Sequence, residues 1–230
     1  PKLAAVCAAA ISDRKPAKMG WTVGKAPNVA FIRRFRMKDG SVRTNPGVGN
    51  PEILHPIGDV DERVNVLRFD REGTNSIVLV NYGLHADTVN GNLLSADWPG
   101  WMRRTVEKAL DGTKCMFFPG CEGDVGSTNV HPKPGDMNDT EISFDNEMKS
   151  PGMARFVGRA LAGTVLQVYD KVEYVDVDDI LAAARAKGVR FGVKPMEKPP
   201  GYEAYYEQWQ RGEISARAAA KALNVTHPTF

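Results

Sequence analysis

Short apolar runs separated by polar turns fill the first three quarters of the chain, and they predict several strands. The segment Ser76–Tyr82 contains an unbroken apolar run, Ile-Val-Leu-Val, which is typical of a strand buried on both faces. Val64–Asp70 precedes it across a hairpin-like connection, and Cys115–Phe118 is a further buried candidate. Met19–Val23 and Val172–Val177 are shorter strand candidates.

Helical patterns alternate with these strands. Leu3–Ile11 is Ala-rich and favours a helix, and because it resembles the end of a longer helix, we expect the chain to begin inside a domain. Asp97 is a candidate N-cap for a helix that runs to about Leu110, with Pro99 in its first turn. Met153–Tyr169 is a long amphipathic segment. The alternation predicts an α/β domain, that is, a mixed sheet with flanking helices.

Two stretches depart from the alternation. Asn45–Gly58 is dense in Pro and Gly and is predicted to be a long loop, whereas Pro132–Ser150 is polar and is predicted to be irregular. Between the first helix and the first of these loops lies Asn28–Gly40, which is basic and aromatic.

The character of the chain changes after Asp178. Residues 178–200 are basic and rich in Pro and Gly, as in a linker. Tyr202–Arg211 and Ser215–Leu223 are predicted helices, the second with Ser215 as N-cap, and Thr226 is a candidate cap for a third helix. We therefore expect three parts: a domain over residues 1–177, a linker over 178–200 and a small all-α tail over 201–230.

Composition supports this division. The chain has 230 residues, of which 42% are hydrophobic and 25% charged, enough for a sizeable core. Its net charge of +2 is uneven: residues 181–230 carry eight Lys and Arg against four Glu, or +4, and the rest carries 22 against 24, or −2. The tail is thus the basic part.

Other classes are excluded by simple patterns. Three cysteines without metal-type spacing argue against a disulfide framework and fit a reducing compartment. No stretch approaches the roughly 18 apolar residues of a membrane span. The apolar first residues lack a basic region and a cleavage site, so we expect no signal peptide, and a cytoplasmic location is favoured.

The chemistry-bearing feature of the first domain is Asn81-Tyr-Gly-Leu-His85, which places a His just beyond a predicted buried strand. Catalytic groups and ligands of α/β proteins collect at the carboxyl ends of strands. A neutral imidazole in that position is a natural zinc ligand. On position alone, a His that is only hydrogen-bonded within the fold is the more common alternative.

His85 belongs to a series of four sequence blocks. In chain order they are Asp61-Glu-Arg-Val-Asn-Val-Leu-Arg-Phe-Asp70, the strand to His85, Leu94-Ser-Ala-Asp-Trp-Pro-Gly100, and Phe118-Pro-Gly-Cys-Glu-Gly-Asp-Val125. Their order and spacing resemble the neutral/alkaline ceramidase family over about three quarters of the chain. The resemblance implies that residues 1–177 are an internal part of a larger zinc hydrolase domain. It also implies cleavage of an N-acyl amide bond, with a small-molecule amide or a lipid such as a ceramide as substrate.

The resemblance carries over to single residues. It implies that His85 is the second of the family's two zinc histidines. Arg33 or Arg34 matches an Arg that faces the active site, where a guanidinium would stabilise an anionic oxygen; a solvated basic strand is the alternative. Asp97 matches a family Asp, and either a site role or a helix cap suits it.

The sequence also departs from the family pattern. Gly126 stands where the family has a Ser, and Ser127 is shifted by one position, so the nucleophile is either Ser127 or a zinc-bound water. The family's other zinc ligands find no match, and His55 and His131 are poor substitutes. Catalytic zinc usually needs three protein ligands. We therefore expect an incomplete Zn²⁺ site and an inactive chain.

The tail resembles the carboxyl end of a serine recombinase, where a basic linker leads into a helix-turn-helix. The resemblance implies DNA as a partner through residues 181–230. Its candidate phosphate contacts are Arg185, Lys187, Arg190 and Lys194. Its candidate base contacts are Thr226, His227 and Thr229. A generic basic helical hairpin is the alternative, and the chain as a whole looks like two family fragments joined near residues 177–180.

Overall fold

The computed structural model describes residues 2–92, 94–132, 149–176 and 199–224. The chain divides into two compact units, Pro1–Ile180 and Leu181–Phe230. The boundary lies close to the predicted change at residue 178. Each unit is described by itself below.

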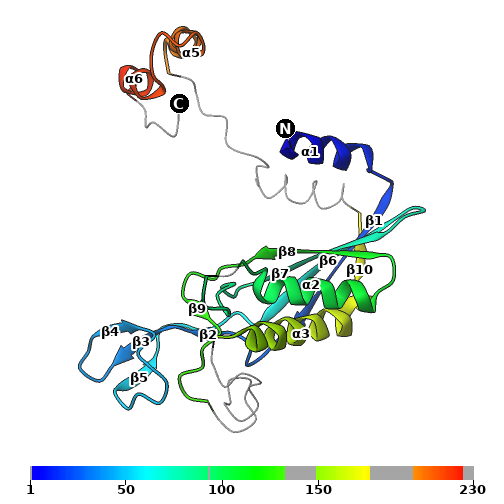
Figure 1. Cartoon of the computed structure of the whole chain (residues 1–230), viewed down its shortest axis with the longest axis vertical. Helices are drawn as coiled ribbons and strands as arrows, with labels where there is room; N and C mark the ends of the chain where they lie inside the picture. Colours follow the sequence, from blue (N-terminus) through cyan, green and yellow to red (C-terminus); the bar gives the residue numbers. More distant parts are fainter. Residues whose placement is uncertain (1, 93, 133–148, 177–198, 225–230) are drawn as a thin grey trace. The chain divides into compact units, whose positions relative to one another are not determined.

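A five-stranded mixed sheet forms the centre of the first unit (Figure 1), in the order β10-β1-β6-β7-β8. Its strands are β1 (Ala17–Lys25), β6 (Arg63–Arg71), β7 (Ser76–Tyr82), β8 (Thr113–Pro119) and β10 (Glu173–Val175). β7 and β8 are parallel, and all other neighbours are antiparallel. The mixed sheet with flanking helices confirms the predicted α/β class.

Two helices cover one face of this sheet (Figure 1), and the hydrophobic core lies between these helices and the sheet. α2 (Asp97–Ala109) and α3 (Pro151–Val168) pack tightly against each other at Gly158. A Cβ added at Gly158 would lie 2.5 Å from the Trp101 Cβ and 2.7 Å from the Trp98 carbonyl oxygen. The helix side of the core includes Trp98, Met102, Val106, Val157, Leu161 and Val165, and the sheet side includes Val64, Val66, Val78 and Val80.

The opposite face of the sheet is open among the described residues. Trp21, Leu67, Leu79 and Met116 are cross-strand neighbours in one row, and Trp21 and Met116 are each 45% exposed. The prediction that Ser76–Tyr82 is buried on both faces is therefore wrong, and Cys115–Phe118 is likewise buried on one face. An apolar run shows that a strand carries apolar side chains on both faces. Burial of both faces also requires a second layer of helices or strands on the face opposite α2 and α3.

Two small sheets extend the unit beyond one end of the main sheet (Figure 1). β2 (Phe31–Ile32) pairs with β9 (Val125–Gly126). β3 (Arg34–Met37) pairs with β4 (Val42–Thr44) and β5 (Ile53–Pro56). The predicted loop Asn45–Gly58 is thus wrong over β5, because Phe35, Met37, Val130 and Ile53 form a small hydrophobic cluster that holds this strand.

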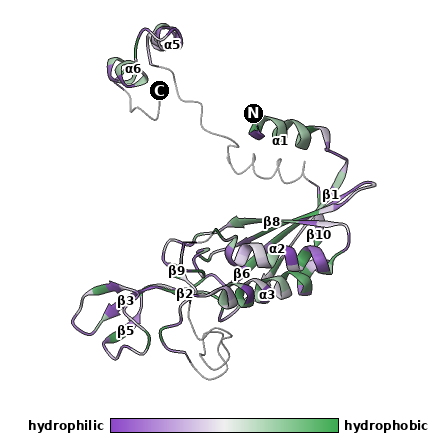
Figure 2. Ribbon diagram, viewed as in Figure 1, coloured by the Kyte–Doolittle hydropathy of each residue, from purple (hydrophilic) through white to green (hydrophobic). Residues whose placement is uncertain are grey.

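The first unit has one further α-helix, α1, which lies close to the predicted range Leu3–Ile11. α1 (Lys2–Ser12) is largely hydrophobic (Figure 2), yet none of its residues is buried. A short 3-10 helix, η1 (Tyr169–Lys171), joins α3 to β10. No described helix is long and apolar enough to span a membrane.

The second unit contains α5 (Tyr202–Gln210) and α6 (Ala216–Ala222), which contact each other. The Ser215 side chain accepts a hydrogen bond from the Ala218 N–H at 3.1 Å, which confirms Ser215 as N-cap. Ala219 and Ala220 are buried. The predicted third helix from Thr226 and most of the predicted linker lie outside the described residues.

Candidate functional site

The loops that follow β7 and β8 lie against each other at the carboxyl ends of these parallel strands. Gly120 N–H donates to the Tyr82 carbonyl at 2.9 Å, and His85 N–H donates to the Val125 carbonyl at 3.3 Å. A Cβ at Gly83 would lie 2.7 Å from the Cys121 carbonyl oxygen, so this close approach requires glycine. The predicted position of His85, beyond a strand end, is confirmed.

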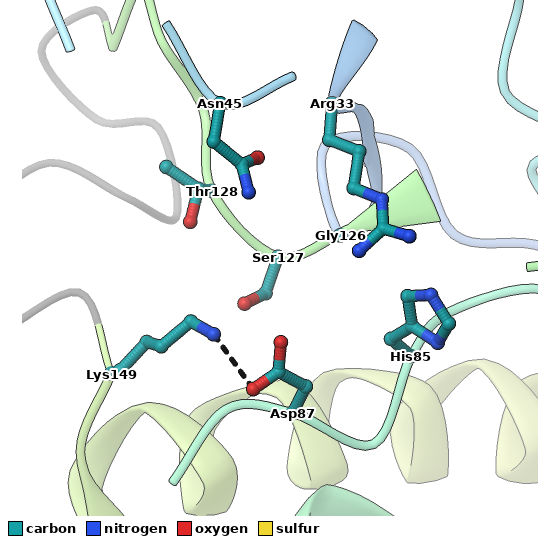
Figure 3. A pocket seen from close by; sticks show the side chains of 8 residues that line it. All are labelled: Arg33, Asn45, His85, Asp87, Gly126, Ser127, Thr128 and Lys149. Carbon is teal, nitrogen blue, oxygen red and sulfur yellow. Dashed lines mark hydrogen bonds and ion pairs between the residues drawn. The ribbon is translucent and has the colours of Figure 1, made fainter. Parts of the chain in front are cut away.

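A small pocket opens between these loops and the β2–β9 strand pair. Eight residues from distant segments line it (Figure 3): Arg33, Asn45, His85, Asp87, Gly126, Ser127, Thr128 and Lys149. Its free volume is about 20 Å³, room for little more than one water molecule. The backbone bond from Arg33 N–H to the Asp124 carbonyl, 2.9 Å, continues the strand pair and brings Arg33 to the pocket.

His85 is partly buried, with 30% of its side chain exposed. Its Nδ1 lies 3.4 Å from Oε1 of Glu122, near enough for electrostatic attraction when the ring is protonated. The Trp98 indole N–H donates to the His85 carbonyl at 3.0 Å, so the first turn of α2 holds the loop that carries the ring.

The two candidate arginines separate clearly. Arg33 lines the pocket, and its Nη2 donates to the Gly123 carbonyl at 2.6 Å. Arg34 instead donates twice to Oδ2 of Asp124, at 2.8 and 3.1 Å, and half of its side chain is exposed. Of the two, Arg33 is the one placed beside His85 and Ser127.

Asp97 does not line the pocket. Its carboxylate is buried and accepts hydrogen bonds from the Thr88 N–H and hydroxyl and from the N–H groups of Val89 and Trp98. The predicted N-cap role is wrong: Ala96 precedes the helix, and Asp97 is the first helical residue, with φ +47°. Asp97 therefore anchors the segment that follows His85.

Sequence patterns missed several residues that line the pocket and also Glu122, which lies beside His85 without lining it. Lys149 Nζ donates to Asp87 Oδ1 at 2.7 Å across the opening (Figure 3). Asp87 lies two residues after His85, and Glu122 stands in the last of the four blocks; these positions were the available signals. Nothing in the pattern around Asn45 or Lys149 indicates their placement, because loops from far apart bring them there.

The described residues do not fit a complete zinc site. His85 and Glu122 are two possible ligands, and no group of three or more His, Cys, Asp or Glu side chains suited to a metal occurs in the described ranges. Catalytic zinc usually has three protein ligands. His55 lies in β5, where its Nδ1 is 2.8 Å from the Pro56 carbonyl, away from this pocket.

The DNA-contact predictions stay predictions. Arg185, Lys187, Arg190, Lys194, Thr226, His227 and Thr229 all lie outside the described residues.

Comparisons with known proteins give a distant likeness. No family model and no curated protein matches the chain. Among solved structures, neutral ceramidase from Pseudomonas aeruginosa is similar at 16% identity and a TM-score of 0.43, over 66% of this chain and 22% of that one. A ceramidase complexed with C2 gives 16% identity and 0.44 over the same shares. The chain thus spans about a fifth of the length of these solved chains.

Proposed function

We propose that residues 1–177 are part of an amide hydrolase of the neutral-ceramidase type, and that the pocket around Arg33, His85 and Ser127 is their contribution to its catalytic centre. The observation that carries the proposal is the convergence of these three side chains, from three distant segments, on one pocket. The sequence predicts His85 and Ser127 as site residues, and Arg33 as one of two alternatives with Arg34. The four sequence blocks that resemble the family support the same function.

Arg33 is suited to bind the carbonyl oxygen of an amide. Within the described part of the chain its guanidinium has no carboxylate partner, and it donates a hydrogen bond to the Gly123 carbonyl. A guanidinium has five N–H donors, and the bond to the Gly123 carbonyl uses one of them. A fixed guanidinium beside the carbonyl stabilises the negative charge that develops on oxygen when the amide is attacked.

Ser127 is the candidate nucleophile that this chain itself supplies. It is 6% exposed and lines the same pocket as Arg33. The alternative nucleophile is a metal-activated water, which requires more ligands than His85 and Glu122. Because the described residues provide two ligands, we expect this chain alone to turn over an N-acyl amide poorly or not at all.

Amide binding tests the proposal without requiring turnover. We expect the carbonyl group of a short-chain N-acyl amide to enter the pocket, whose free volume is about 20 Å³, and to shift the NMR resonances of the residues that line it. Arg33→Gln should weaken binding about tenfold, the size expected when a charge-assisted hydrogen bond is lost. Arg34→Gln is the matched control and should bind as wild type does. Absence of binding, or equal binding by Arg33→Gln and wild type, would contradict the proposal.

Zinc content provides a second test. Elemental analysis of wild type and His85→Ala should show less than one zinc per chain in both. One zinc per wild-type chain that is lost in His85→Ala would mean that residues outside the described ranges complete the site, and amide hydrolysis should then be measurable. The binding test above does not depend on this result.

DNA binding by residues 181–230 is the second candidate function. It rests on the sequence resemblance to a serine recombinase, because the contact between α5 and α6 and the Ser215 cap fit a generic helical hairpin equally well. Fluorescence anisotropy on duplex DNA should then show an affinity that falls steeply with salt. Replacing the four candidate phosphate contacts, Arg185, Lys187, Arg190 and Lys194, with Gln should abolish that binding.

A further inference from the structure

A second and larger cavity lies in the first unit, beside the small sheets and away from His85. Its volume is about 310 Å³, and it is bordered by β2, the start of β3, and residues 56–62 and 129–131. This volume lies at the lower end of the range for small-molecule sites. It can therefore hold a small organic molecule.

The cavity combines an apolar floor with acidic groups. Ile32, Phe35 and Val130 are buried beneath it, and Phe31 adds a second, partly buried aromatic ring. Asp59 and Glu62 supply its negative charges, His131 is a further titratable lining residue, and no Lys or Arg is among the residues that line it. The floor favours hydrocarbon, and the two carboxylates favour positive charge.

Neither of these carboxylates is neutralised within the described ranges, since Asp59 and Glu62 form no ion pair there. Arg63, the nearest cation along the chain, is bound by Asp61 through two hydrogen bonds of 2.7 and 2.8 Å. The negative field also reaches the core: burial first, and then the charges of Glu62 and Asp61, raise the pKa of Tyr82. A bound anion would be repelled, whereas a cation would be attracted.

We propose that this cavity binds a small organic cation, an amine or quaternary ammonium with an apolar body. The hydrocarbon part lies on the floor formed by Ile32, Phe35 and Val130, and the charged head faces Asp59 and Glu62. Aromatic rings such as Phe31 and Phe35 also attract cations through their faces. A bare metal ion would leave the apolar floor unused. This inference does not depend on the proposed hydrolase.

Three ligands of equal length test the charge requirement on the full chain: hexylammonium, 1-hexanol and hexanoate, titrated by NMR with resonances of Phe31 and Val130 as probes. Hexylammonium should bind about fivefold more tightly than hexanol, the effect expected of partly exposed charge pairs, and its affinity should fall with added salt. Hexanoate should bind most weakly. Equal affinities for hexylammonium and hexanol would overturn the proposal.

Variants locate the site. Asp59→Asn combined with Glu62→Gln should reduce hexylammonium affinity to that of hexanol and leave hexanol binding unchanged; both positions are exposed, so the fold should be retained. Asp61→Asn is the matched control, because Asp61 lies between them in sequence but pairs with Arg63 and does not line the cavity. An equal loss in Asp61→Asn, or no loss in the double variant, would overturn the assignment.

Discussion

The two cavities adjoin the paired strands β2 and β9 but use different members of the pair: Gly126 of β9 lines the His85 pocket, whereas Phe31 and Ile32 of β2 line the cavity beside Asp59. The His85 pocket is small and polar, and its loop is held by partly buried hydrogen bonds in which Asp97 accepts from Val89 and Trp98 donates to the His85 carbonyl. The cavity beside Asp59 is larger and is held by apolar side chains, with its charges at the surface. The first should depend on single polar contacts, whereas the second should tolerate changes of charge and respond to changes of apolar volume.

Asp97→Ala should have the largest effect, because it removes the acceptor of four hydrogen bonds from Thr88, Val89 and Trp98. Leaving these buried donors unpaired should lower the free energy of unfolding by about 3 kcal/mol. Urea denaturation measures this loss. Asp97→Asn keeps one oxygen acceptor and tolerates a positive φ, so it should lose clearly less. A loss below about 1 kcal/mol in Asp97→Ala would show that the loop is held in another way.

Gly158→Ala tests the packing of helix α3 against helix α2. The added Cβ would lie 2.5 Å from the Trp101 Cβ and 2.8 Å from the Met102 backbone nitrogen, so α2 and α3 must separate. We expect destabilisation of about 2 kcal/mol, as for other overpacked cores. Gly163→Ala, in the same helix with nothing within 4 Å of the new Cβ, should instead stabilise by about 0.5 to 1 kcal/mol. Thermal unfolding of both variants decides the point.

The main sheet and the His85 pocket differ in how well the sequence predicts them. The apolar runs that became β6, β7 and β8 predicted the sheet, and the end of one run predicted His85, because burial and period leave a local pattern. The role of Asp97 leaves none, since it depends on a left-handed backbone and on donors eight and nine residues away. Lys149 and Asn45 reach the pocket only through tertiary packing.

The small sheet was missed for a related reason. Pro and Gly between Asn45 and Gly58 predict a loop, but β5 is held by contact of Ile53 with the cluster of Phe35, Met37 and Val130. Val130 is distant in sequence, so no local window contains the signal. The cavity beside Asp59 was missed with it, because its floor is assembled from the same residues.

Phe35→Leu sharpens the comparison from the apolar side. It removes part of a buried ring from a small cluster that also underlies the cation cavity, and we expect a loss of about 1 kcal/mol. Hydrogen exchange should increase in β3, β4 and β5, while the amides of β6 and β7 keep their protection, since they belong to the main core. Equal acceleration in both sheets would show that the two regions unfold as one.

Asp70→Asn concerns the end of β6 opposite Glu62 and should have the smallest effect. Burial alone would raise the pKa of Asp70, but hydrogen bonds from Tyr174, Arg68 and Ser76 outweigh it and lower this pKa. A carboxylate with a lowered pKa stabilises the fold above its unfolded pKa of about 3.9, and this stabilisation is lost as pH falls through the folded value. Wild type should therefore exceed Asp70→Asn in unfolding free energy at pH 7, and the difference should shrink below about pH 4.

Tyr174→Phe, which removes one of the hydrogen-bond donors to Asp70, should show a smaller change in the same direction. A difference that stays constant between pH 7 and about pH 3 would mean that Asp70 contributes packing alone, and acid sensitivity would then have to come from other carboxylates.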